Sequence, residues 1–259
     1  MSTDIRPTTT NPVIEFRDVE YVSGGREVLH HLNLAIYGGE ILVLLGRSGS
    51  GKTTALKLVN RLLIGSGGEV RVEGRDARAW DVIKLRRHIG YAIQEVGLFP
   101  HYTVERNVGL LLSLERWSKE KISTRVDELL RLVGLSPEIC SRYPHQLSGG
   151  QRQRVGVARA LAADPPILLM DEPFGALDPL TRSDLQREFL SLQQKLGKTV
   201  LFVTHDLHEA LLLGSRIALL EEGRLVSLSS PEQFLSSSDP LVKKYVEAFG
   251  SVEHVRGKK

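Results

Sequence analysis

A glycine-rich loop is the feature that most constrains what this chain can fold into. The apolar residues 41–45 before it predict a fully buried strand, and residues 54–59 after it predict the start of a helix. Strand, glycine loop and helix in this order are the context of a phosphate-binding loop, in which backbone N–H groups turn inward around an anion. The helix start adds its positive dipole end. The loop comprises Gly46, Arg47, Ser48, Gly49, Ser50, Gly51, Lys52 and Thr53, with Thr54 directly after it.

Two side chains of this loop suit a nucleotide with several phosphates. Lys52 can reach the outer phosphates as a point charge, and the Thr53 hydroxyl can hold a magnesium ion. The alternative is a glycine turn that merely joins two core elements. Eight matching positions in the right strand–helix context favour the phosphate-binding loop.

Composition is that of an ordinary globular chain and argues against several classes. The 259 residues are 41% hydrophobic and 25% charged, and no apolar run approaches the roughly 18 residues of a membrane span. The net charge of +3 comes from scattered basic residues, so we expect no nucleic-acid partner. The single cysteine, Cys140, excludes an internal disulfide and has no partner base nearby, so we expect no catalytic role for it. Residues 1–12 are expected to form a disordered leader and residues 251–259 a basic tail.

Strand and helix signals alternate over most of the chain. Strands are predicted at 13–19, 28–36, 41–45, 69–74, 89–93, 167–170 and 199–203, with a hairpin from 216–220 and 224–228. Helices are predicted at 52–63, 81–87, 103–114, 118–133, 152–161, 180–196 and 207–213, with short ones from Pro231 and Pro240. Buried strands joined by helices imply an α/β fold with a parallel sheet covered on both faces. Its chemistry is then expected at the carboxyl ends of the strands.

Two carboxylates follow one of the buried strands. Asp171 and Glu172 come directly after residues 167–170. Beside a phosphate-binding loop, Asp171 can hold Mg²⁺ through water, and Glu172 can orient an attacking water or accept its proton. Alone, the pair could equally be a strand end with solvated charges.

A second helix start also suits an anion. Ser148 is a good N-cap for the helix expected from Arg152, and Gly149 and Gly150 leave its first amides open. An ordinary capped helix after a turn at Pro144 is the alternative, and it would be preferred if the stretch stood alone.

Together these motifs resemble the nucleotide-binding subunit of an ATP-binding cassette (ABC) transporter. The stretch 147–151, Leu-Ser-Gly-Gly-Gln, is similar to that family's signature motif, and Gln94 to its Q-loop. Residues 175–178 resemble its D-loop, and His205 resembles its switch histidine. The resemblance covers about residues 13–230. It implies a P-loop NTPase (RecA-like) core over 13–95 and 163–250, with a mostly parallel central sheet, an N-terminal antiparallel β subdomain and an inserted helical subdomain over 96–162.

The resemblance also implies a mechanism and partners. Two subunits would face head to tail, with ATP and Mg²⁺ between the phosphate loop of one and the signature motif of the other. Ser148, Gly149, Gly150 and Gln151 would meet the γ-phosphate in trans, and Asp178 would cross the interface. Glu172 would be the general base, His205 would contact the γ-phosphate, and Thr53, Asp171 and Gln94 would serve the metal. Permease subunits would dock beside residues 96–101 at the cytoplasmic face of the membrane, where the chain would act as a peripheral subunit.

Two positions need separate treatment. The aromatic residue that stacks on adenine in this family would fall near Ser23, so Tyr21 is the nearest candidate, and adenine held without an aromatic ring is the alternative. His205 and His208 stand three apart and could suggest a metal pair, but no third ligand is evident.

Within the family, residues 89–101 are most similar to bacterial importers of osmoprotectants such as glycine betaine, choline or carnitine, and residues 57–62 agree with them. Such importers also use an extracytoplasmic substrate-binding protein. Members of this group often carry a C-terminal pair of cystathionine-β-synthase-type domains, and we expect a short form that lacks them. An importer of another small solute, a lipid or drug exporter, a DNA-repair or chromosome ATPase, and a soluble phosphate-loop kinase are the alternatives.

Overall fold

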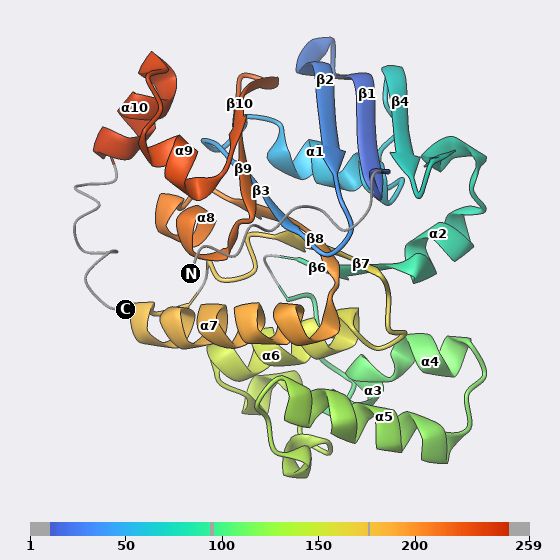
Figure 1. Cartoon of the computed structure of the whole chain (residues 1–259). Coiled ribbons are helices and arrows are strands. Elements are labelled where there is room, and N and C mark those ends of the chain that lie inside the picture. Colours follow the sequence, from blue (N-terminus) through green and yellow to red (C-terminus); the bar gives the residue numbers. More distant parts are fainter. Residues whose placement is uncertain (1–10, 94–95, 176, 249–259) are drawn as a thin grey trace. The chain divides into compact units, whose positions relative to one another are not determined.

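The computed structural model describes residues 11–93, 96–175 and 177–248 (Figure 1). The chain divides into two compact units, one formed by residues up to 77 and from 201 onward, the other by residues 78–200. The leader, the basic tail and Gln94 lie wholly or mostly outside the described residues. The expected limits of the helical insertion, after residues 95 and 162, stay a prediction.

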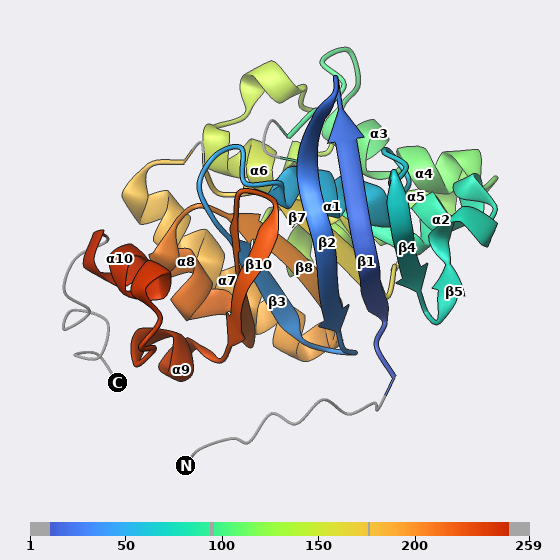
Figure 2. The same ribbon diagram turned by 90° about the horizontal axis from the view of Figure 1, so that it is seen from above.

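An antiparallel sheet opens the first unit, as the resemblance implies. Its strands are β1 (Ile14–Ser23), β2 (Arg26–Ile36), β4 (Gly67–Val72) and β5 (Arg75–Asp76), in the order β2-β1-β4-β5 (Figure 2). Gly24 and Gly25 take φ values of 57° and 78°, which fits the tight turn between β1 and β2. β1 extends beyond the expected end at residue 19, because pairing with β2 continues across register shifts on both sides of Tyr21.

The first unit also contains β3 (Ile41–Leu45), most of β8 (Thr199–Thr204), β9 (Arg216–Glu221) and β10 (Arg224–Ser229), in the order β10-β9-β3-β8. β3 and β9 run parallel, whereas β9 and β10 form the expected antiparallel hairpin. All side chains of β3 and β8 are buried, as a strand covered on both faces requires. The helices of this unit are α1 (Lys52–Val59), α8 (Leu207–Leu213), α9 (Pro231–Leu235) and α10 (Pro240–Ala248).

The second unit is mainly helical. Its strands β6 (Ile89–Ala92) and β7 (Ile167–Asp171) pair in parallel, and β7 is followed in the sheet order by β8, whose first two residues belong to this unit. Over the described part of residues 96–162 there is no strand, as expected. The helices are α2 (Val82–His88), α3 (Val104–Val108), α4 (Leu110–Leu114), α5 (Lys119–Leu132), α6 (Gly149–Ala160) and α7 (Pro179–Leu196), with 3₁₀ turns at Ala77–Ala79, Pro137–Ile139 and Pro144–Gln146. The predicted fold class, an α/β cassette with a mostly parallel central sheet and an antiparallel N-terminal sheet, is confirmed.

Three expected helix limits are wrong, each for a local reason. α1 ends at Val59 rather than near Leu63, because the N–H groups of Leu62 and Leu63 both turn back to the Lys57 carbonyl. The single helix expected over 103–114 is divided at Gly109 into α3 and α4. A Cβ at Gly109 would lie 2.5 Å from Cγ2 of Ile122, so glycine lets α5 pack closely at the break.

The third limit concerns α6, which begins at Gly149 and not at Arg152. Its start therefore includes both glycines of the stretch 147–151. Among the described residues, no helix is both long and apolar enough to cross a bilayer.

Candidate nucleotide-binding site

The glycine loop follows β3 as predicted and is fixed by close backbone contacts. A Cβ at Gly46 would lie 2.3 Å from the Leu220 carbonyl oxygen of β9, so no larger residue fits there. The Gly223 N–H of the β9–β10 turn donates to the Ser50 carbonyl at 3.2 Å. Gly51 has a φ of 99°, and a Cβ there would lie 2.9 Å from the Val28 carbonyl oxygen of β2. The shape of the loop is thus set by two strands and a turn that are distant in sequence.

Lys52 is buried at the first residue of α1, with 4% of its surface exposed. Its Nζ donates to the carbonyl oxygens of Gly46 at 2.7 Å and Arg47 at 2.8 Å. A buried ammonium needs such partners, and here it is held over the start of the loop. Thr53 and Thr54 follow in the first turn of α1, where both are half-buried.

The loop fits a phosphate in three respects. Gly49 and Gly51 both adopt positive φ, which turns successive backbone N–H groups. The hydroxyl of Ser50 is buried and has no hydrogen-bond partner among the described residues, so a ligand oxygen could satisfy it. The start of α1 has no side-chain cap at Gly51, which leaves its first amides for an anion.

His205 lies beside this loop in the first unit. It follows β8 directly, and α8 begins two residues later with Asp206 as its N-cap. The Asp206 carboxylate accepts from the N–H of His208 at 2.7 Å, and the Thr204 hydroxyl accepts from the Asp206 N–H at 3.0 Å, so the turn is firmly held. A pocket of about 250 Å³ is lined by Gly46, Arg47, Ser48, His205, Lys244, Tyr245 and Ala248. The predicted loop and the predicted switch histidine therefore share one pocket.

Asp171 and Glu172 are in the second unit at the end of β7. Asp171 is 8% exposed and closes the strand. Burial, together with the nearby Asp171 charge, raises the pKa of Tyr91 on the neighbouring strand β6 to about 12. Glu172 has a φ of 45°, a left-handed conformation that is strained for a residue with a Cβ, and its carbonyl accepts from the Gly175 N–H at 3.2 Å. Backbone strain of this kind is common at functional sites.

Ser148 caps α6, and the cap is reciprocal. The Gln151 N–H donates to Ser148 Oγ at 3.2 Å, and the Ser148 N–H donates to Gln151 Oε1 at 3.0 Å. The Ser148 hydroxyl therefore accepts from the Gln151 amide, and the amides of Gly149 and Gly150 lie before that amide in the first turn of α6. A Cβ at Gly150 would lie 2.7 Å from Cγ2 of Thr181, so the start of α6 packs closely against the start of α7.

Asp178 is the N-cap of α7, a role that the sequence did not predict. Its carboxylate accepts from the Thr181 N–H at 3.1 Å, and hydrogen bonds to Thr181 lower the pKa of Asp178. Arg182 donates to the carbonyl oxygens of Gly175 at 3.3 Å and Leu177 at 3.1 Å. The segment before α7 is therefore fastened next to the signature stretch.

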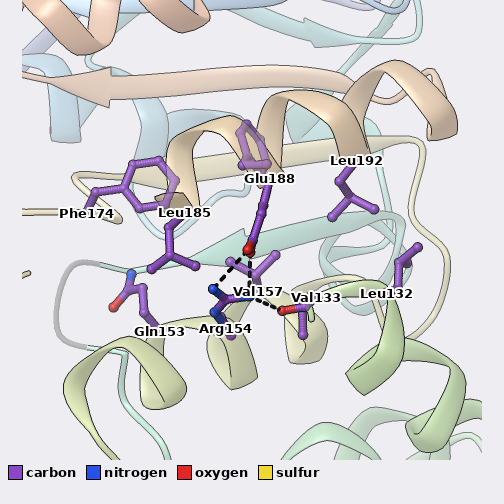
Figure 3. A pocket seen from close by; sticks show the side chains of 10 residues that line it. Leu132, Val133, Gln153, Arg154, Val157, Phe174, Leu185, Glu188 and Leu192 are labelled. Carbon is purple, nitrogen blue, oxygen red and sulfur yellow. Dashed lines mark hydrogen bonds and ion pairs between the residues drawn. The ribbon is translucent and has the colours of Figure 1, made fainter. Parts of the chain in front are cut away.

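Arg154 joins three helices around this region, as Figure 3 shows. From α6 it donates to the Val133 carbonyl at the end of α5 at 2.8 Å and to Glu188 Oε1 of α7 at 3.1 Å, with a second contact to Glu188 Oε2. The pair borders an apolar pocket that includes Leu185 and Val157. Gly134 has a φ of 69°, which favours glycine, and a Cβ there would lie 2.5 Å from a guanidinium nitrogen of Arg154. No sequence pattern indicated this contact.

Arg159 links the same helix to the segment after Gln94. Its guanidinium donates to the carbonyl oxygens of Val96 at 2.5 Å and Gly97 at 2.7 Å, and burial lowers its pKa. A Cβ at Gly156 would lie 2.5 Å from Cγ1 of Val96. Residues 96–97 therefore pack closely against α6, the helix that begins in the signature stretch. Gln94 itself lies outside the described residues.

Two further candidate residues, Tyr21 and His208, do not line the pocket beside the phosphate loop. Tyr21 is half-buried in β1, opposite Leu29, and does not line the pocket beside the loop. The aromatic residue that lines it is Tyr245 of α10, about two hundred residues further along the chain. His208 is exposed, and its Nδ1 lies 3.6 Å from the Asp206 carboxylate.

Known proteins share these features. The model of the ABC transporter family matches residues 29–175. The glycine betaine/carnitine/choline transport ATP-binding protein OpuCA of Bacillus subtilis is 48% identical over 226 residues, which are 87% of this chain and 59% of that protein. The glycine betaine uptake system ATP-binding protein YehX of Escherichia coli is 50% identical over 224 residues, 86% of this chain and 73% of that protein.

A solved structure shows the same likeness in three dimensions. The dimeric ATP-binding cassette MJ0796, in a post-hydrolysis state bound to ADP and Pi, has a TM-score of 0.76 and 35% identity, covering 84% of this chain and 98% of that one. The chain belongs to the ABC transporter family, in its ATP-binding cassette class. It spans 59% of the length of OpuCA.

Proposed function

We propose that this chain is the ATP-binding and ATP-hydrolysing subunit of an ABC importer for a quaternary amine such as glycine betaine, choline or carnitine. The observation that carries the ATPase is the glycine loop after β3, with its buried Lys52 and the unsatisfied Ser50 hydroxyl. The importer and its cargo rest on the likeness to transport proteins such as OpuCA and YehX.

Each predicted site residue then has a role in the proposed chemistry. The loop amides and Lys52 bind the phosphates, and His205 contacts the γ-phosphate from the same pocket. Glu172 orients the attacking water and accepts its proton. Thr53, Asp171 and Gln94 would supply oxygen ligands, the kind that Mg²⁺ prefers. The metal would neutralise charge on the phosphates.

The signature stretch serves a second copy of the chain. We expect Ser148, Gly149, Gly150 and Gln151 of one subunit to face the phosphate loop of the other, with Asp178 at the interface. Two observations support this arrangement: the α6 start packs against the α7 start, and the related cassette MJ0796 is a dimer. Because Ser148 Oγ already caps α6, the glycine amides supply most of the anion contacts in this proposal.

A role in an importer implies membrane partners. Two permease subunits are expected to receive this ATPase at the cytoplasmic face of the membrane, beside residues 96–101, and an extracytoplasmic substrate-binding protein delivers the solute to them. Tyr21 remains a candidate for adenine stacking, although its place in β1 favours binding of adenine without it.

The ATPase is tested with purified protein and Glu172→Gln. We expect phosphate release by the wild type and a loss of about 100-fold or more in the variant, since general base catalysis contributes roughly 10²–10⁴-fold. Asp184→Asn, which neutralises an exposed carboxylate of α7, is the matched control and should keep its activity. Wild-type turnover in Glu172→Gln would remove Glu172 from this role.

The cargo is tested by transport. The chain is reconstituted with the permease that copurifies with it, and uptake of radiolabelled glycine betaine, choline and carnitine is measured with and without ATP. ATP-dependent uptake of one of these solutes supports the proposal. Transfer of phosphate from ATP to a small molecule would instead indicate a soluble kinase, and ATP-driven efflux would indicate an exporter.

A further inference from the structure

The turn that carries His205 is held by the residues on both sides of it. β8 ends at Thr204, which is 1% exposed, and the half-buried Asp206 caps α8. His205 between them is exposed, so its place beside the phosphate loop depends largely on the backbone of this turn. Whatever fixes the turn therefore bears on the pocket that His205 shares with residues 46–48.

Glu209 is a carboxylate in the first turn of α8, and only 3% of its surface is exposed. A buried carboxylate is destabilising unless hydrogen bonds compensate for the water that it loses. The Thr204 hydroxyl donates to Glu209 Oε2 at 2.5 Å, a length typical of a hydroxyl bonded to a charged oxygen. This bond joins the end of β8 to the start of α8, with His205 in the turn between them.

The bond to Glu209 also determines what the Thr204 hydroxyl can accept. A hydroxyl has one proton to donate and lone pairs that accept hydrogen bonds. Because the proton is directed to Glu209, the oxygen can serve as an acceptor, and the Asp206 N–H donates to it at 3.0 Å. Thr204 and Asp206, the two neighbours of His205, are thereby bonded to each other.

Asp206 closes the arrangement from the other side. Its carboxylate accepts from the N–H groups of His208 at 2.7 Å and Glu209 at 3.4 Å, which caps α8. Thr204, Asp206 and Glu209 are thus connected by a closed ring of hydrogen bonds that spans His205.

This ring is attached to the strand that leads into the phosphate loop. α8 packs on β3, and both belong to the first unit (Figure 1). Just after α8 ends, a Cβ at Gly214 would lie 3.1 Å from Cγ2 of Val43, so the helix end and the strand are close together. Because the phosphate loop follows β3 directly, an intact ring gives His205 a set position relative to residues 46–48.

We infer that Glu209 is a positioning residue for His205: through the Thr204 hydroxyl it fixes the turn that places the imidazole beside the phosphate loop. Glu209 is buried and does not line the pocket, so it acts through Thr204 and is not a catalytic residue. The inference rests on the proposed function for its kinetic readout, whereas the ring and its effect on His205 do not depend on ATP.

The first measurement reports on His205 without ATP. NMR spectra are recorded on protein with ¹³C-labelled histidine rings, and the His205 signal is assigned by its loss in His205→Ala. We expect this signal to shift or broaden in Glu209→Ala, which removes the acceptor, and in Thr204→Val, which keeps the side-chain shape but lacks the hydroxyl. Thermal unfolding by circular dichroism shows whether each variant is folded, and Thr204→Val provides the test if Glu209→Ala is not.

The second measurement is steady-state ATP hydrolysis. We expect kcat to fall about tenfold in Glu209→Ala and Thr204→Val, because a small displacement of a catalytic group is enough for such a loss. The KM for ATP should stay within about twofold, since neither change removes a contact of the phosphate loop. Glu209→Gln retains an oxygen that can accept from Thr204, so its kcat should return to within about threefold of the wild type.

Thr199→Val is the matched control, because it makes the same substitution at a buried threonine at the other end of β8. Its His205 signal and its kcat should match those of the wild type. An unchanged His205 signal in a folded Glu209→Ala or Thr204→Val protein would overturn the inference, and so would a kcat that stays at the level of an active wild type. Changed signals that are absent from Thr199→Val support it even if the wild type hydrolyses no ATP, in which case only the proposed function fails.

Discussion

The contact between Arg154 and Glu188 makes a stability prediction that can be worked from the structure. The pair joins α6 to α7, with 18% of the Arg154 side chain and 48% of the Glu188 side chain exposed. A fully exposed ion pair contributes about 0.2–1 kcal/mol, and a hydrogen bond to a charged group about 1.5–3 kcal/mol. Because Glu188 is half exposed, we expect a coupling free energy of about 1–1.5 kcal/mol between the two side chains.

Arg154→Ala should lower the free energy of unfolding more than Glu188→Ala does. Glu188→Ala leaves Arg154 its bond to the Val133 carbonyl and should cost about 1.5 kcal/mol. Arg154→Ala loses that bond too, and also the contact of its stem with the apolar pocket, so it should cost about 3 kcal/mol. At about 2–4 °C per kcal/mol, its Tm should fall by roughly 6–12 °C.

A double-mutant cycle in urea measures the coupling, and α7 offers a matched control. Arg187 and Asp184 lie 2.7 Å apart, within hydrogen-bonding distance like Arg154 and Glu188, but their side chains are 69% and 62% exposed. We expect a coupling of less than about 0.5 kcal/mol for this exposed pair. A control coupling as large as that of Arg154 with Glu188, or an additive Arg154–Glu188 cycle, would refute the reasoning that burial decides the strength of the pair.

Two other changes test the loop and the lone thiol. Gly46→Ala should destabilise the protein by more than about 2 kcal/mol in urea unfolding, because its Cβ would lie 2.3 Å from a backbone oxygen. Gly49→Ala, where φ is 83° and the space around the Cβ is open, should destabilise it by about 1 kcal/mol. Equal losses of stability in the two variants would contradict the packing argument. Burial and the nearby Asp127 raise the pKa of Cys140 to about 11, so folded protein at pH 8 should react with iodoacetamide about 100-fold more slowly than unfolded chain. The folded state holds the thiol proton more tightly than the unfolded chain, so the stabilising contribution of Cys140 is present below pH 9 and is lost as the pH rises through 11. An equal alkylation rate in folded and unfolded protein would contradict this account, because it would show that the thiol is accessible.

Much of the fold could be predicted because its signals are local. Residues 41–45 of β3, 167–170 of β7 and 200–203 of β8 are buried and apolar throughout, as expected of strands that are covered on both faces. Thr103 and Ser148 cap helices through their own following amides, so cap and helix could be read within four residues. The glycine loop was predictable for the same reason, since its glycines, lysine and threonine are consecutive.

Apart from the cap of α7 by Asp178 and the bond between Thr204 and Glu209, the contacts that the sequence did not predict are long-range. Tyr245 lines the pocket beside the phosphate loop only because β9, α9 and α10 return the chain to the loop, and no spacing in the sequence encodes that path. Arg154 and Glu188 are separated by 34 positions on two helices, so neither stands out as a pair. The break at Gly109 was missed because helix propensity does not show that α5 packs against this glycine.

The central claim, that each ATP site is built from two copies of the chain, has a direct test by mixing two inactive variants. Lys52→Ala damages the phosphate loop and Ser148→Arg damages the signature stretch, so each protein alone should hydrolyse ATP at background rates. In a head-to-tail heterodimer, the loop of the Ser148→Arg chain faces the signature of the Lys52→Ala chain, and one site is intact. We predict that ATP hydrolysis returns when the two are mixed, reaching a substantial fraction of the wild-type rate. Activity in either variant alone, or none in a mixture shown by sedimentation to contain heterodimers, would contradict the account.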